Sequence, residues 1–199
     1  MNNEFYIVLI LIIVGAAAYF LSKKKEDNTA PETIFHNEPA TVDSLNNADT
    51  LIYNRFANEV AGIIKKFNCS IITPMVLAVI KKESSLLFQT KANKDITGDF
   101  GYSIGYMQVS RYALSDVNQK YNLNYSIADL SDEYKNLVTG ILYLQLCYNS
   151  AQIQNSNNPT WLAFKKYNGG IDETDKSLNT AATKYADSTY NYFLTFTGV

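Results

Sequence analysis

Apolar residues recur every three or four positions through much of the chain, which is the spacing of amphipathic helices. The first such run, in residues 51–67, has its apolar side chains at Ile52, Phe56, Val60, Ile63, Ile64 and Phe67. The next run, MVLAVI, is continuous and follows Thr73, a candidate cap, and Pro74, which suits the first helical position. The pattern therefore predicts an amphipathic helix followed by a buried one.

Three further helices are expected in the second half of the chain. Ser131 is a candidate cap, and apolar residues at helical spacing follow it as far as Tyr148. Residues 161–167 predict a short helix that ends at Gly169–Gly170. Residues 176–196 predict the last helix.

Two segments lack helical spacing. Residues 149–158 are rich in Asn and Gln, which predicts a solvated loop. Residues 97–109, TGDFGYSIGYMQV, contain three glycines and several aromatic residues, a composition typical of turns and short strands. The fold class predicted for residues 44–199 is therefore mainly α with a small β element.

The N-terminal segment has a different pattern. Residues 5–22 contain no charged side chain and are almost wholly apolar. As a helix they span roughly 27 Å, close to the thickness of a bilayer core. A cleaved signal peptide would carry Lys or Arg before this run, and MNNE supplies neither. We therefore predict that residues 1–22 are a single-pass transmembrane anchor that contacts the lipid bilayer through residues 5–22.

The segment after the predicted anchor is polar. Residues 23–43 are acidic overall, contain two prolines and have few apolar side chains, which predicts a flexible linker. The chain thus divides into an anchor (1–22), a linker (23–43) and a globular domain (44–199). The lysines at positions 23–25 follow the apolar run directly, so the positive-inside rule places the domain on the cytoplasmic side.

Charge and residue usage exclude several classes of function. Residues 51–199 carry fourteen basic against twelve acidic side chains, too even a balance for a nucleic-acid-binding surface. His36 is the single histidine and lies in the predicted linker, which argues against a Ser-His-Asp triad and a histidine-rich metal site. Cys69 and Cys147 are too few for a zinc cluster, and whether they form a disulfide stays open.

Glu83 is a candidate general acid. It lies at the end of the predicted buried helix, with Val79 and Ile80 one turn earlier. The negative end of the helix dipole and partial burial both disfavour an ionised carboxyl group, so we expect a raised pKa. A raised carboxyl pKa suits a general acid that works near neutral pH. We expect the neighbouring Lys81 and Lys82 to face solvent.

Three short motifs occur in order along the predicted domain: Glu83-Ser84-Ser85, Gly105-Tyr106-Met107-Gln108 and Tyr167-Asn168-Gly169-Gly170. Together they resemble motifs of the SLT-type lytic transglycosylases and the goose-type lysozymes, which share a catalytic domain. The resemblance covers about residues 51–197. It implies a lysozyme-like domain that cleaves the β-1,4 bond between N-acetylmuramic acid and N-acetylglucosamine in peptidoglycan, without a metal or cofactor.

The resemblance also implies roles for individual residues. Glu83 would be the general acid and base of the reaction. Tyr106 stands where these families have leucine, a change that is tolerated if its ring packs and its hydroxyl finds a partner. The side chains that would hold the peptidoglycan glycan strand are Ser85, Tyr106, Gln108, Tyr167, Asn168 and Tyr185.

The outcome of the reaction stays open at this point. An inverting hydrolase needs a second carboxylate, roughly 6.5–9.5 Å from the acid, to hold a water molecule. Asp99, in a Gly-Asp-x-Gly segment that looks goose-type, is either this residue or a turn residue beside glycine. Goose-type enzymes have a second aspartate where this chain has Ser110, and its absence favours the transglycosylase, in which the 6-hydroxyl of the sugar attacks.

Two further questions stay open. A non-enzymatic alternative is a degenerate lysozyme fold that binds glycan or has a structural role in the membrane of a bacteriophage particle. Peptidoglycan lies outside the cytoplasmic membrane, whereas residues 23–25 place the domain inside. The localisation is therefore either the internal membrane of a bacteriophage particle or a bacterial cytoplasmic membrane from which the domain faces the wall.

Overall fold

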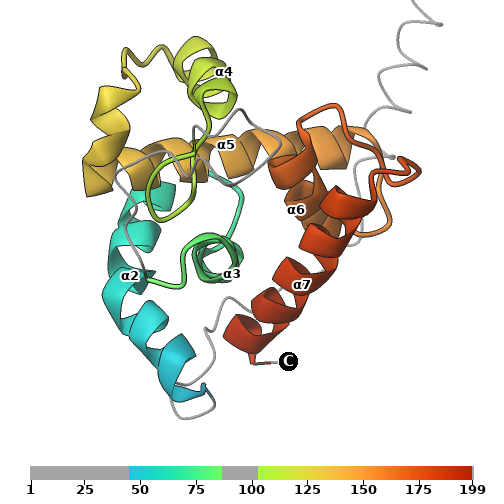
Figure 1. The fold of residues 1–199 in the computed structure, drawn as a ribbon, viewed down its shortest axis with the longest axis horizontal. Coiled ribbons are helices and arrows are strands. Elements are labelled where there is room, and N and C mark those ends of the chain that lie inside the picture. The colour runs from blue at the N-terminus through green and yellow to red at the C-terminus, as the bar shows by residue number, and fades with distance from the viewer. Residues whose placement is uncertain (1–44, 87–102, 199) are drawn as a thin grey trace, which may run out of the picture. The chain divides into compact units, whose positions relative to one another are not determined.

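A computed structural model describes residues 45–86 and 103–198 of the chain (Figure 1). Helices account for most of these residues. The α-helices are α2 (Asn47–Lys66), α3 (Thr73–Glu83), α4 (Arg111–Tyr121), α5 (Glu133–Ile153), α6 (Pro159–Gly169) and α7 (Thr180–Thr197). A short 3₁₀ helix, η2 (Ala128–Ser131), precedes α5. The prediction of a mainly helical domain is therefore confirmed.

Helices α3 and α5 form the centre of the hydrophobic core. Each residue of α3 from Met75 to Ile80 is at most 2% exposed, as the continuous apolar run predicted. Residues 136–145 of α5 are also all buried. Figure 1 shows α3 end-on between α2 and α7, and it packs against both of these helices. The last turn of α3 is therefore held from two sides.

Two predicted helix caps are wrong by one residue. Helix α3 includes Thr73, so its cap position is occupied by Ile72, whose side chain makes no capping hydrogen bond. Helix α5 is capped by Asp132, whose carboxylate accepts a hydrogen bond from the backbone N–H of Lys135 at 2.9 Å. Ser131 belongs to η2 instead. An aspartate at this position is favoured because its charge also interacts with the positive end of the helix dipole.

Helical structure extends beyond the prediction in two places. Helix α5 continues to Ile153, so the loop predicted for residues 149–158 is helical in its first half. Burial of Ala151 in the core accounts for this extension, because tertiary packing outweighs the polar composition. Helix α4 has no predicted counterpart. Only Ala113, Leu114 and Val117 of α4 are buried, which is too short an apolar pattern to be recognised in the sequence.

The predicted β element is reduced to one antiparallel bridge in the described part of the chain. Ile104 and Val109 form this bridge, and the four residues between them make a turn. The described residues contain no longer strand, because the turn is followed at once by Ser110 and α4. The earlier half of the predicted segment, residues 97–102, lies outside the described ranges.

The predicted anchor (1–22) and linker (23–43) also lie outside the described residues. None of the helices in residues 45–86 and 103–198 combines the length and the apolarity that crossing a membrane requires. Cys69 and Cys147 are both free thiols. Burial raises the pKa of the Cys69 thiol to about 11, which keeps it protonated at neutral pH.

Lys81 does not face solvent as the sequence suggested. Its ammonium nitrogen lies 2.5 Å from Oδ1 of Asp49, whose side chain is fully buried. The same ammonium lies 4.3 Å from the ring centroid of Tyr192 on α7. Lys81 therefore links the first turn of α2 and the middle of α7 to the last turn of α3. Lys82 is exposed, as expected.

Candidate active site

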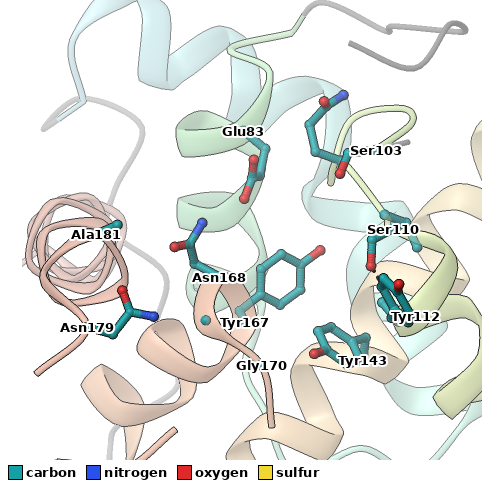
Figure 2. Close-up of a pocket in the computed structure, with 14 residues that line it drawn as sticks. Glu83, Ser103, Ser110, Tyr112, Tyr143, Tyr167, Asn168, Gly170, Asn179 and Ala181 are labelled. Carbon is teal, nitrogen blue, oxygen red and sulfur yellow. Dashed lines mark hydrogen bonds between the residues drawn. The ribbon is translucent and has the colours of Figure 1, made fainter. Parts of the chain in front are cut away.

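A pocket of about 580 Å³ lies beside the carboxyl end of α3 (Figure 2). Its volume is in the range typical of ligand-binding sites. The pocket brings together residues from α3, α4, α5, α6 and α7 and from the turn before α4. The lining residues are Glu83, Ser103, Gln108, Val109, Ser110, Tyr112, Ala113, Tyr143, Tyr167, Asn168, Gly169, Gly170, Asn179 and Ala181.

Glu83 is the last residue of α3 and is half-buried. The helix ends here because Ser84 and Ser85 leave the helical conformation, and Ser85 has a φ of +47°. The hydroxyl of Ser84 donates to the carbonyl of Ile80 at 3.2 Å, and that of Ser85 donates to the carbonyl of Lys81 at 2.9 Å. The carbonyl of Ile80 also accepts a hydrogen bond from the backbone N–H of Ser84 at 3.0 Å, whereas the bond from Ser85 supplies a donor to a carbonyl in the last turn of the helix.

The carboxylate of Glu83 is bound by Tyr185 of α7. The hydroxyl of Tyr185 donates a hydrogen bond to Oε1 of Glu83 at 2.6 Å. Tyr185 is 7% exposed, so its ring is fixed by the core while its hydroxyl reaches the site. The carboxyl group at the pocket is therefore oriented by a residue that is 102 positions away in the sequence.

The electrostatic environment of Glu83 contains opposing contributions. The negative end of the α3 dipole and partial burial disfavour its ionised form, whereas the hydrogen bond from Tyr185 favours it. Burial, and secondly the charge of Glu83, raise the pKa values of both Tyr167 and Tyr185 well above the ordinary value. Both tyrosines therefore keep their protons at neutral pH and act as hydrogen-bond donors.

Asn136 of α5 fixes the turn that carries Gln108. Its amide Nδ2 donates to the carbonyl of Ile104 at 2.8 Å, and its Oδ1 accepts from the backbone N–H of Met107 at 3.4 Å. Gly105 has a φ of +81°, and a Cβ atom at this position would lie 2.2 Å from Nδ2 of Asn136. The glycine of the second motif is thus required both by the backbone conformation and by the closeness of Asn136.

Gln108 presents an unpaired acceptor at the pocket. Its backbone has a φ of +43°, a conformation that is uncommon for a residue other than glycine. Its Nε2 donates to the carbonyl of Gly105 at 2.8 Å, which fixes the orientation of the amide. The Oε1 atom is buried and makes no hydrogen bond with any described residue. Because buried polar atoms are nearly always paired, an unpaired Oε1 on a lining residue is a candidate acceptor for a ligand.

Tyr167 connects the third motif to the second. Its hydroxyl donates to the carbonyl of Met107 at 2.7 Å, and its ring packs against Tyr143 with centroids 5.4 Å apart. Asn168 follows at the exposed end of α6 and lines the pocket. Figure 2 shows the side chains of Glu83, Asn168 and Tyr167 gathered around the same space.

Two buried lysines hold the wall of the pocket formed by the loop between α6 and α7. Lys165 and Lys166 are at most 1% exposed, and burial lowers the pKa of Lys166. Their ammonium groups donate to backbone carbonyls of the loop, Lys165 to Thr174 and Ser177 and Lys166 to Ile171 and Glu173. These bonds fix the loop that leads from Gly170 to Asn179, both of which line the pocket.

The structure brings together most of the side chains that the sequence singled out. Glu83, Gln108, Tyr167 and Asn168 line one pocket, and Tyr185 is bonded to Glu83. Asp99 lies outside the described residues.

Two predicted substrate-binding residues are placed elsewhere. Ser85 is exposed, does not line the pocket and bonds to its own helix. The ring of Tyr106 packs edge-on against Phe56, with centroids 4.7 Å apart, and its hydroxyl donates to Glu133 at 3.4 Å. The ring of Tyr106 is thus packed and its hydroxyl has a hydrogen-bond partner, which are the two conditions for its replacement of leucine. Tyr106 is not among the residues that line the pocket.

Several lining residues were not identified from the sequence. Ser103, Tyr112, Tyr143 and Asn179 belong to no recognised motif, and fifteen tyrosines in the chain make any one of them uninformative. Ser110 lines the pocket, but its hydroxyl also caps α4 by accepting a hydrogen bond from the backbone N–H of Ala113 at 3.2 Å. The described residues contain no cluster of three or more His, Cys, Asp or Glu side chains suited to a metal ion.

Comparison with known protein families identifies the domain. Residues 64–190 match the family model described as the transglycosylase SLT domain, which is more than half of the chain. The chain belongs to the SLT transglycosylase family. The resemblance inferred from the three motifs is thereby confirmed, and all three lie within the matched residues.

A solved structure supports the same fold. The X-ray structure of an inactive mutant of lytic transglycosylase Slt from Pseudomonas aeruginosa matches with a TM-score of 0.54 and 16% sequence identity. The match covers 74% of this chain and 25% of that one, so this chain corresponds to a minor part of the larger protein. At this identity the likeness shows the shared fold. No match was found among curated proteins.

Alanine substitutions at Gly105 and Gly62 test how Asn136 holds the turn between Ile104 and Val109. Gly105→Ala is expected to lower the free energy of unfolding by at least about 2 kcal/mol, because of the positive φ and the overlap with Asn136. Gly62→Ala in α2 is expected to raise it by about 0.5–1 kcal/mol, because a Cβ there meets nothing within 4 Å. Urea unfolding followed by circular dichroism measures both. Equal effects of the two substitutions would contradict this account of the turn.

Proposed function

We propose that the chain is a membrane-anchored lytic transglycosylase that cleaves the MurNAc–GlcNAc β-1,4 bond of peptidoglycan, with Glu83 as general acid and base. The observation that carries the proposal is the position of Glu83: it ends a buried helix, lines the pocket and accepts a hydrogen bond from Tyr185. Membership of the SLT transglycosylase family supplies the reaction class.

In the proposed reaction, the protonated carboxyl group of Glu83 donates its proton to the glycosidic oxygen. The bond from that oxygen to C1 of the muramic acid then breaks, and positive charge develops on the sugar ring. The oxygen of the 6-hydroxyl of the same sugar forms a new bond to C1, and its proton returns to Glu83. One product fragment ends in a 1,6-anhydro muramic acid, the other begins with an N-acetylglucosamine that has a free 4-hydroxyl, and no water is consumed.

The composition of the pocket favours this outcome over hydrolysis. Glu83 is the only carboxylate among the described lining residues. Ser110 stands where goose-type enzymes have an aspartate, and its hydroxyl is engaged in capping α4. Hydrolysis by a goose-type mechanism would instead require Asp99 to hold the attacking water. The type of product end distinguishes the two reactions.

The remaining pocket residues fit the binding of an N-acetylated sugar. The Oε1 atom of Gln108 offers an acceptor, which suits the N–H of an acetamido group. Asn168 offers both donors and acceptors at the exposed rim, whereas the amide of Asn179 caps α7 and donates to Glu173. Tyr167 holds the turn that carries Gln108 through its bond to the carbonyl of Met107. These groups would fix the sugar so that its glycosidic oxygen faces Glu83.

Replacing the proposed acid tests the activity directly. Glu83→Gln keeps the size of the side chain but removes its titratable proton, so release of 1,6-anhydro products from purified peptidoglycan is expected to fall about a thousandfold. Mass spectrometry of the soluble fragments measures this. Glu133→Gln is the matched control, because Glu133 is an exposed glutamate outside the pocket.

Each other outcome of this experiment has a defined meaning. Activity that survives Glu83→Gln would refute the role of Glu83. Reducing ends in place of anhydro ends would establish the goose-type hydrolase. A wild-type chain that releases no fragments would favour the non-enzymatic alternative, a lysozyme-like fold that binds glycan or has a structural role.

Removing the hydroxyl of Tyr185 tests its effect on Glu83. The acid is active when protonated, so activity falls as the pH rises through the ionisation of Glu83. Tyr185 stays protonated because burial and the charge of Glu83 raise its pKa, and its hydrogen bond stabilises the ionised carboxylate. Tyr185→Phe is therefore expected to move the alkaline fall in activity to higher pH. Initial rates from pH 4 to pH 9 measure the shift, and Tyr190→Phe on the same helix is the control. An unmoved alkaline limb would contradict the assignment.

The location of the enzyme is proposed from the sequence. We propose that residues 5–22 anchor it, either in the internal membrane of a bacteriophage particle or in a bacterial cytoplasmic membrane. The full chain is expected to sediment with membranes after an alkaline wash, whereas a chain that lacks residues 1–22 is expected to be released. A soluble full chain would refute the anchor.

Protease added to intact spheroplasts distinguishes the two orientations of the domain. Digestion of the domain indicates an enzyme that faces the wall, and protection indicates the phage arrangement.

A further inference from the structure

Tyr112 is an exposed aromatic residue at the proposed glycan pocket. Six large apolar or aromatic residues in the described chain are exposed, and Tyr112, at 53%, is the one among them that lines the pocket. The others are Leu51, Ile127, Tyr134, Ile153 and Leu178. A large exposed apolar surface beside a binding pocket is more informative than one elsewhere, because ligand binding can bury it.

The ring of Tyr112 is held in place from both the backbone and a neighbouring side chain. Tyr112 is the second residue of α4, whose first turn is fixed by the cap that Ser110 makes with Ala113. Nη2 of Arg111 donates to the hydroxyl of Tyr112 at 2.9 Å, and the guanidinium carbon lies 4.8 Å from the ring centroid. The guanidinium thus covers part of the ring and restricts its motion. Because the side chain is already ordered, a ligand that binds to it causes a smaller loss of conformational entropy.

The position of Tyr112 differs from that of the proposed acid. Glu83 comes from α3 and Tyr112 from α4, and Figure 2 draws Tyr167 between them in this view. Glu83 and Tyr112 therefore line the same pocket from two different helices. Because a glycan strand is a continuous chain of rings, its next rings extend away from the cleavage point along the pocket.

We propose that Tyr112 is a stacking platform for a pyranose ring of the glycan strand in this pocket. The C–H face of a pyranose is apolar and flat enough to pack on a phenol ring, while its equatorial hydroxyls stay directed to the sides. Ser103 and Asn179 also place polar side chains along this pocket. This inference rests on the proposed function for the identity of the ligand, but its test does not require catalysis.

The test measures the binding of soluble glycan strands from which the peptides have been removed. The full chain in detergent carries Glu83→Gln, so that the strands are not cleaved during titration, and Kd is measured by calorimetry. Adding Tyr112→Ala is expected to raise Kd about tenfold, through the loss of apolar contact with the sugar. Tyr112→Phe keeps the ring and is expected to stay within about twofold of the parent.

Two controls separate stacking from misfolding. Tyr134→Ala removes an exposed tyrosine outside the pocket and is expected to leave Kd unchanged. Circular dichroism is expected to show an intact fold for Tyr112→Ala, because alanine favours the exposed first turn of a helix. If Tyr112→Ala leaves Kd unchanged, or if Tyr112→Phe weakens binding as much as alanine does, the platform is refuted.

The same measurements separate this inference from the proposed activity. A wild-type chain that makes no anhydro products, yet binds glycan in a manner that depends on the ring of Tyr112, would refute the activity and support the platform. A wild-type chain that makes anhydro products, with a Kd that is insensitive to Tyr112→Ala, would support the activity and refute the platform.

Discussion

The hydrogen bond between Tyr185 and Glu83 is the contact on which the organisation of the site depends. Glu83 ends a helix buried between α2 and α7, and Tyr185 is a core residue of α7 whose hydroxyl reaches the carboxylate at 2.6 Å. Because the helix and the tyrosine are both fixed by packing, the carboxyl group has a defined direction at the edge of the pocket.

The rest of the pocket is built by polar contacts between segments that are far apart in the sequence. Asn136 of α5 holds the turn after Ile104, and Tyr167 of α6 holds the same turn through the carbonyl of Met107. This turn carries Gln108, whose backbone has a positive φ and whose Oε1 atom makes no hydrogen bond with the described residues. Lys165 and Lys166 are buried and hold the loop between α6 and α7, whose ends line the same pocket. Such a framework keeps binding groups in place before a ligand arrives, which lowers the cost of binding.

One carboxylate among the described pocket residues is enough for the chemistry that we propose. When the attacking group belongs to the substrate itself, the enzyme needs to move one proton out and back and does not need to hold a water molecule. The remaining work is positioning, for which hydrogen bonds from amides and tyrosines and stacking on Tyr112 are suited. Tyr185 and Tyr112 therefore have separate proposed roles, the first on the acid and the second on the strand.

The sequence by itself determined the helical class, the buried helix that ends at Glu83, the three motifs and the family. Each of these depends on the spacing of apolar residues or on a short run of neighbouring residues. It did not determine α4, whose apolar pattern is short, or the caps at Ile72 and Asp132. Tertiary structure alone decided that Tyr106 packs against Phe56 while Tyr112 and Tyr143 line the pocket. The physical reason is that the direction of a side chain depends on the packing of distant helices, and one tyrosine among fifteen carries no local mark of the surface it will face.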